Sequence, residues 1–445
     1  MPEKLCKKKH LTSFQLIILG FAGVILLGTF LLMLPFSSLD KMPTPFHEAL
    51  FTATSAVCVT GLVVKDTGTY WSPAGQAIIL VLIQIGGLGV VTVAASAPLL
   101  SGKKISLMQR STMQNAISAP KVGGIVRLTK FILKGTFLFE AAGALLLLPV
   151  FLPDYGLKGI WLAVFHSISA FCNAGFDILG TAANPFPSLT RYSGNILVNV
   201  VIMLLIIIGG IGFLTWDDIY TNKLNFKRYR MQSKIILMTT GCLILFPAVF
   251  FFICDLENLS AWKRLLAALF QSVTTRTAGF NTVNISEMSE ASKAIMILLM
   301  LIGGSPGSTA GGMKTTTFTV LILNAIAIFR SQENAGAFGR RLECHVIKNA
   351  ATIAMLYFTL FFCGGLAISV YESLPLLDCL YEAASAVGTV GLTLGITSGL
   401  HTFSKVVLII LMYLGRVGGL TLIYAVFSGK KGENAKLPVE KVTVG

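Results

Sequence analysis

The segment FTATSAVCVTGL, residues 51–62, recurs three more times along the chain. The later copies are FHSISAFCNAGF at 165–176, LFQSVTTRTAGF at 269–280 and YEAASAVGTVGL at 381–392. All four align without a gap on one glycine, and the successive glycines lie 114, 104 and 112 residues apart. Self-similarity of this kind indicates that the chain is built from structural repeats, here four of them.

Each copy lies between two apolar segments. The preceding apolar segments lie near residues 11–36, 125–151, 235–254 and 346–370. The following ones contain a glycine-rich element, which reads IGGLG at 85–89, IGGIG at 208–212, IGGSP at 302–306 and LGRVG at 414–418. Small residues are common where transmembrane helices pack, so these elements are interpreted as packing or hinge positions, or alternatively as pore-lining ones.

The short segment in the middle of each repeat is the informative one. Residues 44–57 and 376–387 are too short to cross a bilayer, and such segments are typical of re-entrant helices. The irregular stretch after each is tolerated at membrane depth only where it is buried in protein or lines a water-filled cavity. The sequence therefore predicts an all-α polytopic membrane protein, with eight transmembrane helices and four re-entrant pore segments around a central pore. The expected parts are a cytoplasmic N-terminus at 1–10, pore repeats at 11–100, 125–215, 231–329 and 346–428, and a cytoplasmic tail at 429–445.

Four irregular stretches around one axis would place backbone carbonyls in a ring, which can replace the hydration shell of a potassium ion. The fourth stretch reads TVG, the first three residues of the potassium-channel filter pattern. A single glycine would be read as a packing position, but four in register are not. The predicted potassium ligands are the backbone carbonyls of four tripeptides, named here the filter tripeptides: Val59, Thr60 and Gly61; Asn173, Ala174 and Gly175; Thr277, Ala278 and Gly279; Thr389, Val390 and Gly391.

Composition supports a membrane protein and excludes other classes. Of the 445 residues, 54% are hydrophobic and 12% are charged. The formal charge of +15 does not indicate nucleic-acid binding, because 24 of the 35 basic residues lie in alternate inter-span segments. That is the positive-inside pattern, and it predicts that both termini are cytoplasmic. The eight cysteines show no paired spacing and are interpreted as small apolar residues. The chain carries no HExxH motif, and its five histidines do not cluster near paired carboxylates, so an enzyme is not expected.

The third repeat differs from the others in its second span. Residues 303–317, named here the gate loop, are almost all small or polar and interrupt that span. A continuous lipid-facing helix is not expected there, and the position predicts a loop beneath the filter that obstructs the path. The predicted gate residues are Gly303, Gly304, Gly307, Ser308, Thr309, Gly311, Gly312, Lys314 and Arg416. A phosphate-binding loop is excluded because Met313 separates the second glycine from Lys314.

Charged residues at membrane depth are costly and usually functional. Arg416 replaces a glycine of the fourth glycine-rich element, and we expect it to donate hydrogen bonds to carbonyls of the gate loop; a structural ion pair is the alternative. Arg276 precedes the third filter tripeptide, and we expect it to point behind the filter toward an acid such as Glu382. The sequence assigns no role to Glu140.

On these motifs the hydrophobic body, about residues 11–428, resembles the Trk/Ktr/HKT superfamily of cation-translocating subunits, and most closely the bacterial KtrB type. Some members of that superfamily have serine at the first filter position, which goes with sodium transport. The resemblance implies potassium selectivity here, since this chain has Gly61. It also implies that the segment matching the gate loop is an intramembrane gate and that an arginine matches Arg416.

The same resemblance implies partners and a location. It implies a homodimer with one pore in each subunit, a cytosolic ring of nucleotide-binding regulatory subunits of the KtrA type, activation by sodium, and a place in the bacterial inner membrane. Potassium is the expected transported ion, with no covalently bound cofactor. The basic inner segments 101–124 and 217–234 and the C-terminal tail are expected to meet such a regulator or anionic lipid. Two questions stay open: whether flux is channel-like or coupled to sodium, and where sodium binds.

A sodium-coupled symporter with inverted repeats is the nearest rival. The four repeats of this chain are all predicted to start on the cytoplasmic side. Repeats of one orientation favour a pore around an axis along the membrane normal.

Overall fold

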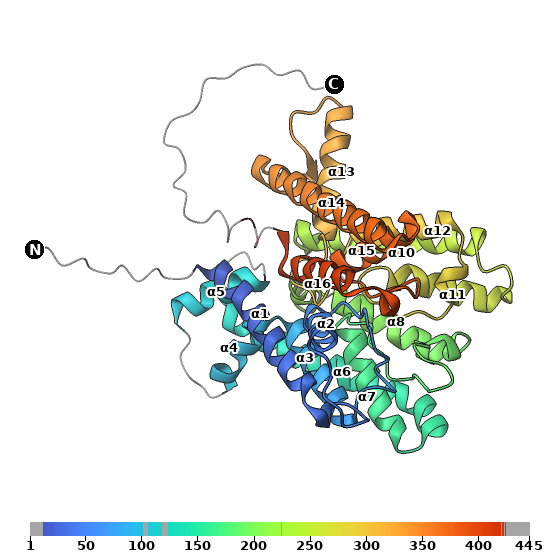
Figure 1. The fold of residues 1–445 in the computed structure, drawn as a ribbon. Helices are drawn as coiled ribbons and strands as arrows, with labels where there is room; N and C mark the ends of the chain where they lie inside the picture. Colours follow the sequence, from blue (N-terminus) through green and yellow to red (C-terminus); the bar gives the residue numbers. More distant parts are fainter. Residues whose placement is uncertain are drawn as a thin grey trace, which may run out of the picture.

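The computed structural model describes residues 12–100, 106–117, 123–223, 225–419, 421 and 423. The predicted cytoplasmic N-terminus at 1–10 and tail at 429–445 lie outside these residues, as does part of the basic segment 101–124. Nearly all regular elements of the described chain are helices. Figure 1 shows that helices close in the sequence pack beside one another in a single body.

A long helix opens each repeat. These helices are α1 (Ser13–Met33), α6 (Ile125–Tyr155), α10 (Met231–Cys254) and α14 (Cys344–Glu372), and each is long and apolar enough to cross a membrane. Their outward faces expose large apolar side chains such as Leu27, Phe137, Phe246 and Val370. Exposed apolar side chains on long helices fit a surface that faces lipid.

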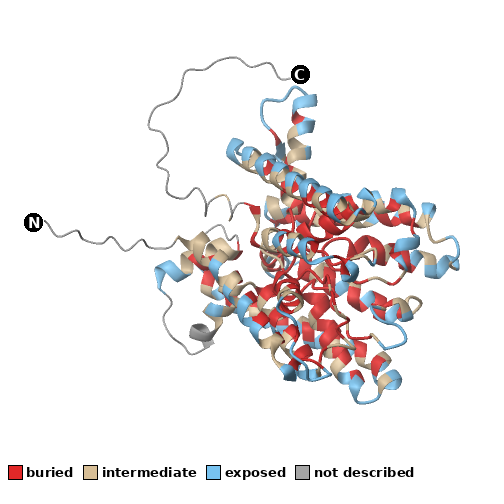
Figure 2. Cartoon of the chain, viewed as in Figure 1, coloured by how far each residue is buried: buried red, intermediate tan, exposed pale blue. Residues whose placement is uncertain are grey.

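A short helix follows in each repeat: α2 (Phe46–Cys58), α7 (Lys158–Phe171), α11 (Ala261–Thr274) and α15 (Leu376–Val387). With 12 to 14 residues, none of them can span a bilayer. Their C-terminal halves are buried, and each ends at most two residues short of a filter tripeptide. Figure 2 shows the buried residues concentrated in the middle of the molecule, where these helices meet.

The second span of each repeat is broken or short. Helices α3 (Pro73–Leu88) and α4 (Val90–Leu100) are bent by 98°, and α8 (Ile196–Gly210) and α9 (Phe213–Asn222) by 97°. The bends fall at Gly89 and Gly212, whose φ angles of 84° and 91° suit glycine and strain other residues. The glycine-rich elements therefore act as hinges in the first two repeats.

In the third repeat, residues 302–314 separate α12 (Glu290–Leu301) from α13 (Thr315–Phe329), so the last three residues predicted for the gate loop are helical. In the fourth, α16 (Thr402–Val417) is capped by Gly418. By length and composition, the described residues contain four candidate spans, or six if each bent pair is one span. The eight predicted spans stay a prediction. The remaining elements are η1 (Pro35–Ser37), α5 (Leu107–Ile117), η2 (Thr190–Tyr192), η3 (Phe226–Arg228), η4 (Ile285–Glu287), η5 (Thr397–Gly399) and a two-stranded hairpin, β1 (Gly336–Ala337) with β2 (Arg340–Arg341).

Candidate ion pathway

The four filter tripeptides come together in a closed ring, named here the filter ring. Each filter glycine faces the carbonyl oxygen of the residue before the glycine of the next repeat. The pairs are Gly61 with Ala174, Gly175 with Ala278, Gly279 with Val390, and Gly391 with Thr60. A Cβ atom added to the glycine would lie 2.5, 2.7 and 2.5 Å from that oxygen in the first three pairs, and closer still in the fourth. Because the pairs run in chain order and the last returns to the first repeat, backbone alone closes the ring.

The filter tripeptides share an unusual backbone conformation. Their first residues are all left-handed, with φ of 55° at Val59, 57° at Asn173, 67° at Thr277 and 51° at Thr389. The four glycines are left-handed as well, with φ between 68° and 94°, and the middle residues are not. Non-glycine residues in this region each cost about 1–3 kcal/mol, and Val59 is β-branched. Since the same strained conformation recurs in four different sequences, the surrounding protein must impose it.

Hydroxyl groups behind the ring help to impose this conformation, in two ways. In the first and fourth repeats, Ser55 Oγ and Ser385 Oγ accept hydrogen bonds from the backbone N–H of Gly61 (3.1 Å) and Gly391 (3.0 Å). In the other two repeats the hydroxyl is instead the donor to the carbonyl after the glycine. Those bonds are Ser169 Oγ to Phe176 O, 2.8 Å, and Thr274 Oγ1 to Phe280 O, 2.5 Å. The third repeat carries Val273 in place of the recurring serine, and the neighbouring Thr274 supplies the hydroxyl that sequence comparison missed.

Buried carboxylates lie behind two of the repeats. Glu382 accepts hydrogen bonds from Thr393 Oγ1 (2.5 Å), Thr397 Oγ1 (2.7 Å) and the backbone N–H of Leu394 (3.2 Å), which holds the chain that follows the fourth filter tripeptide. Glu140, in α6, lies near Cys172 Sγ at 3.9 Å from its Oε1, behind the second filter tripeptide.

The expectation that Arg276 points toward Glu382 is wrong. The partners of Glu382 belong to its own repeat, and the Arg276 side chain makes no hydrogen bond or ion pair with any residue that the structure describes. Arg276 is nonetheless 6% exposed. The structure thus buries a guanidinium group directly before the third filter tripeptide and leaves it without a partner among the described residues.

The gate loop lies against the inner end of the filter ring. A bridge between Ile302 and Met313 holds its two ends together. Thr309 Oγ1 donates to Phe171 O at 3.1 Å and to Asn173 Oδ1 at 3.4 Å, which ties the loop to the second repeat. On the fourth repeat, a Cβ atom added to Gly311 would lie 3.0 Å from the Cβ of Thr389. The loop therefore contacts two of the four quarters of the ring.

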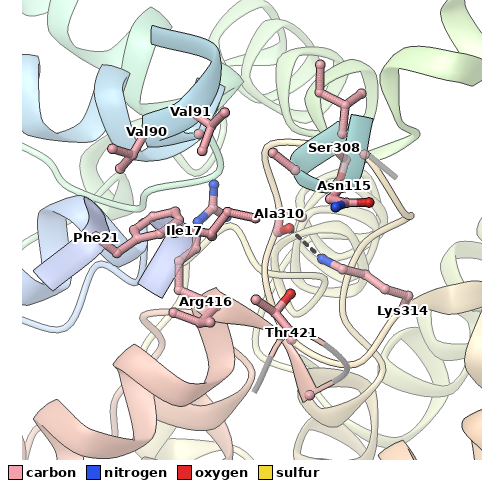
Figure 3. Close-up of a pocket in the computed structure, with 18 of the residues that line it drawn as sticks. Ile17, Phe21, Val90, Val91, Asn115, Ser308, Ala310, Lys314, Arg416 and Thr421 are labelled. Carbon is pink, nitrogen blue, oxygen red and sulfur yellow. Dashed lines mark hydrogen bonds between the residues drawn. The ribbon is translucent and has the colours of Figure 1, made fainter. Parts of the chain in front are cut away.

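Two cationic side chains hold the carbonyls of the gate loop. Arg416 donates to Thr309 O at 2.5 Å, and also to Gly86 O at 2.5 Å and Gly87 O at 3.4 Å on the bent span of the first repeat. Lys314 Nζ donates to Ala310 O at 2.9 Å and to Gly311 O at 3.3 Å. Figure 3 shows both side chains beside the same stretch of the loop. The contact that the sequence predicts between Arg416 and a loop carbonyl is present.

The other predicted gate residues lie in the same loop and allow its close packing. Gly303 packs against Met313 O, and Gly304 against Ser308 Oγ, which donates to Ser305 O. Gly307 and Gly312 are left-handed, with φ of 62° and 67°, and Gly307 packs against Ile117 O at the end of α5. A side chain at either position would be strained.

A cavity of about 200 Å³ lies beneath the gate loop. Its walls include Lys314, Arg416, Asn115, Ser308 and Tyr357, and the described residues that line it include no Asp or Glu. Two cations without a neighbouring carboxylate produce a positive potential, which disfavours a cation in that space.

Comparison with known proteins agrees with this architecture. The chain matches the TrkH family of cation transport proteins over residues 4–434. It is 39% identical to the potassium/sodium uptake protein NtpJ of Enterococcus hirae over 98% of each chain. It is 37% identical to the Ktr system potassium uptake protein B of Bacillus subtilis, over 100% of this chain and 99% of that one.

A solved structure shares the fold. The potassium transporter TrkH from Vibrio parahaemolyticus superposes with a TM-score of 0.73 at 18% identity, over 95% of this chain and 86% of that chain. The family match spans nearly the whole chain, and relatives above 30% identity match it end to end. The chain therefore belongs to the TrkH family of cation transport proteins, as a multi-pass membrane subunit of the KtrB type, and it is a transporter rather than an enzyme.

Proposed function

We propose that this chain takes up potassium ions through a channel-like pore, and that the filter ring is its selectivity filter. The observation that carries the proposal is the closed ring of backbone carbonyls contributed by Thr60, Ala174, Ala278 and Val390. Rings of carbonyl oxygens are the groups that replace the hydration shell of potassium. Two relatives, NtpJ and the Ktr protein B of Bacillus subtilis, are named for potassium uptake.

The proposal includes the architecture around the ring. Eight spans and four re-entrant helices surround the pore, with the bent pairs α3–α4 and α8–α9 each counted as one span and α12–α13 as one span interrupted by the gate loop. The protein lies in the bacterial inner membrane with both termini in the cytoplasm. The Lys and Arg distribution supports that orientation.

The gate loop closes this pore at the inner end of the filter ring. Its contacts with the second and fourth repeats, and the bonds from Arg416 and Lys314, support a closed state in the structure described here. The positive potential of the cavity below adds a barrier to cations. Opening requires the loop to leave these donors.

Regulation comes from a partner and from sodium. The relatives named for the Ktr system support a protein of several components, and we propose a homodimer of this chain on a cytosolic ring of KtrA type, with sodium as activator. The basic segment at 217–234 is a candidate docking face. Arg230 is already paired with Asp217 and Asp218, at 3.2 and 3.3 Å, so the exposed Lys227 and Arg228 of η3 are the better candidates.

The test is potassium uptake by purified protein in liposomes, with and without sodium. A channel-like pore passes potassium down its gradient without stoichiometric sodium movement. The name potassium/sodium uptake protein of one relative favours sodium-coupled symport as the second candidate, and fixed co-transport of sodium would establish it instead. For the docking face, reversal of charge at Lys227 and Arg228 should weaken co-purification of the regulator. Reversal at the exposed Lys158, the first residue of α7, is the control.

A further inference from the structure

Two arginines, the buried Arg276 and the half-buried Arg416, occupy opposite seams of the filter ring. Arg416 of the fourth repeat bonds Gly86 and Gly87 of the first, so it lies on the seam between those repeats. Arg276 of the third repeat lines a small cavity together with Gly210 of the second repeat and Gly304 of the gate loop. In a ring of four, the seam between repeats four and one is opposite the seam between repeats two and three.

The surroundings of these two arginines differ sharply. Arg416 donates to three carbonyl oxygens, one of them in the gate loop. Arg276 donates to no atom of the described residues. A guanidinium group carries five N–H donors, and burying it without partners is costly. The space beside it is also very small, about 10 Å³, which is no more than one water molecule requires.

The carbonyls of the gate loop, in contrast, would lack hydrogen-bond donors if the loop moved. In the structure its carbonyls are occupied: Gly304 O accepts from the N–H of Thr315, Gly307 O from the N–H of Phe213, and Thr309 O from Arg416. Lys314 Nζ donates to the carbonyls of Ala310 and Gly311. A displaced loop would lose these donors, and its carbonyls would then need either pore water or another donor. Arg276 is a donor without a partner among the described residues, and it lines a cavity together with Gly304 of the loop.

We propose that Arg276 is a second anchor of the gate loop, which takes loop carbonyls when Arg416 releases them and so stabilises the open state. The inference rests on the proposed gate. Arg276 is a positioning residue in this scheme: it acts on the ion only through the loop. Gly304 borders the Arg276 cavity, so the part of the gate loop that begins there, residues 304–308, is the part that we expect Arg276 to bond.

The test combines a charge removal with a loop deletion. Arg276→Met removes the donors, and deletion of residues 305–311 removes the leg on which they would act. The bridge between Ile302 and Met313 keeps the ends of that deletion together. Potassium uptake is measured in liposomes at equal protein content. Arg276→Met should lower uptake about tenfold in the full-length loop, since hydrogen bonds to charged groups are individually strong. It should leave uptake unchanged in the shortened loop.

A matched control is Arg264→Gln, which removes a positive charge from the same repeat, on α11, where the arginine donates to Ile253 O at 3.1 Å. It should not alter uptake. An equal loss from Arg276→Met in both loop backgrounds would assign Arg276 to the filter itself and overturn the proposal, as would unchanged or increased uptake in the full-length loop. If Arg276→Met does not fold, Arg276→Lys carries the test, because it keeps the charge but offers three donors for five. It should lower uptake only when the loop is complete. If the deletion alone fails to raise uptake, the gate itself is refuted.

Discussion

The filter ring and the gate loop are in contact, yet they are held in opposite ways. The ring is built four times, with backbone packed on backbone and a glycine at each crossing. The gate loop occurs once, and two charged side chains, Arg416 and Lys314, hold its carbonyls together with backbone N–H groups such as that of Phe213. Close packing of backbone leaves one arrangement, whereas a few charged hydrogen bonds of about 1.5–3 kcal/mol each can be exchanged for others. The repeated part is therefore suited to selecting ions and the unique part to controlling their passage.

The strongest test of the ring is Gly391→Ala. The added methyl would collide with Thr60 O, and alanine is strained at a φ of 94°. We expect potassium uptake to be lost while the protein still reaches the membrane. Gly395→Ala is the control, because Gly395 has a φ of 93° but nothing within 4 Å of an added Cβ. Equal uptake by the two variants in liposomes would contradict a rigid ring.

The corresponding test of the gate loop is removal of residues 305–311. Uptake should rise tenfold or more, since about 1.4 kcal/mol of lost closed-state stability already shifts the equilibrium tenfold. Flux per protein in liposomes, at matched membrane abundance, is the measurement.

Arg416→Gln should act in the same direction but more weakly, because Lys314 still holds the loop. If flux falls in both variants, the loop is a structural insert and the contrast with the ring disappears.

Gly61→Ser tests whether one quarter of the ring can be altered alone. Its Cβ would lie 2.5 Å from Ala174 O, so the backbone of the second repeat must shift to admit it. We expect the preference for potassium over sodium to fall several-fold, with uptake retained. Competition between the two ions in the liposome assay measures this, and an unchanged ratio would argue against the filter assignment.

The smallest expected effect concerns pH at the outer side of the ring. Burial, and then the neighbouring charge of Asp66, raise the pKa of Asp177 to about 7, two residues after Gly175. The folded protein then binds a proton there that the unfolded chain releases near pH 4, so stability falls as pH rises from about 4 to 7. Asp177→Asn should flatten this dependence, because the amide does not titrate. Thermal unfolding in detergent at pH 5 and pH 8 measures the change, and identical pH profiles would refute it.

The sequence predicts the filter tripeptides better than the backbone conformations and hydroxyl groups that hold them in place. Spacing reveals the four tripeptides because only glycine tolerates the approach of a neighbouring backbone, so the residue type itself carries the signal. The left-handed Val59 and Thr277 carry no such signal, since their conformation is imposed by tertiary contacts. The hydroxyl of Thr274 escaped notice because it is displaced by one residue from the recurring serine.

Helix bends and charge pairs were harder to predict. The glycine-rich elements were recognised, but glycine serves both packing and hinges, and the bends at Gly89 and Gly212 emerge only in three dimensions. Arg276 and Glu382 were expected to pair because both are buried charges near the filter. Glu382 is satisfied by threonines of its own repeat instead, since those lie closer along the folded chain. That the loop acts as a gate stays a prediction.

The ring of four crossings on one chain has an evolutionary consequence. In a pore made of four identical subunits, one codon change alters every quarter at once, so any cost is multiplied by four. Here each crossing is encoded separately. Ser55 holds its filter tripeptide by accepting a hydrogen bond, and Thr274 holds its own by donating one. A substitution can therefore change one crossing and leave the other three unaltered. The gate loop is an example on a larger scale, because only the third repeat carries it.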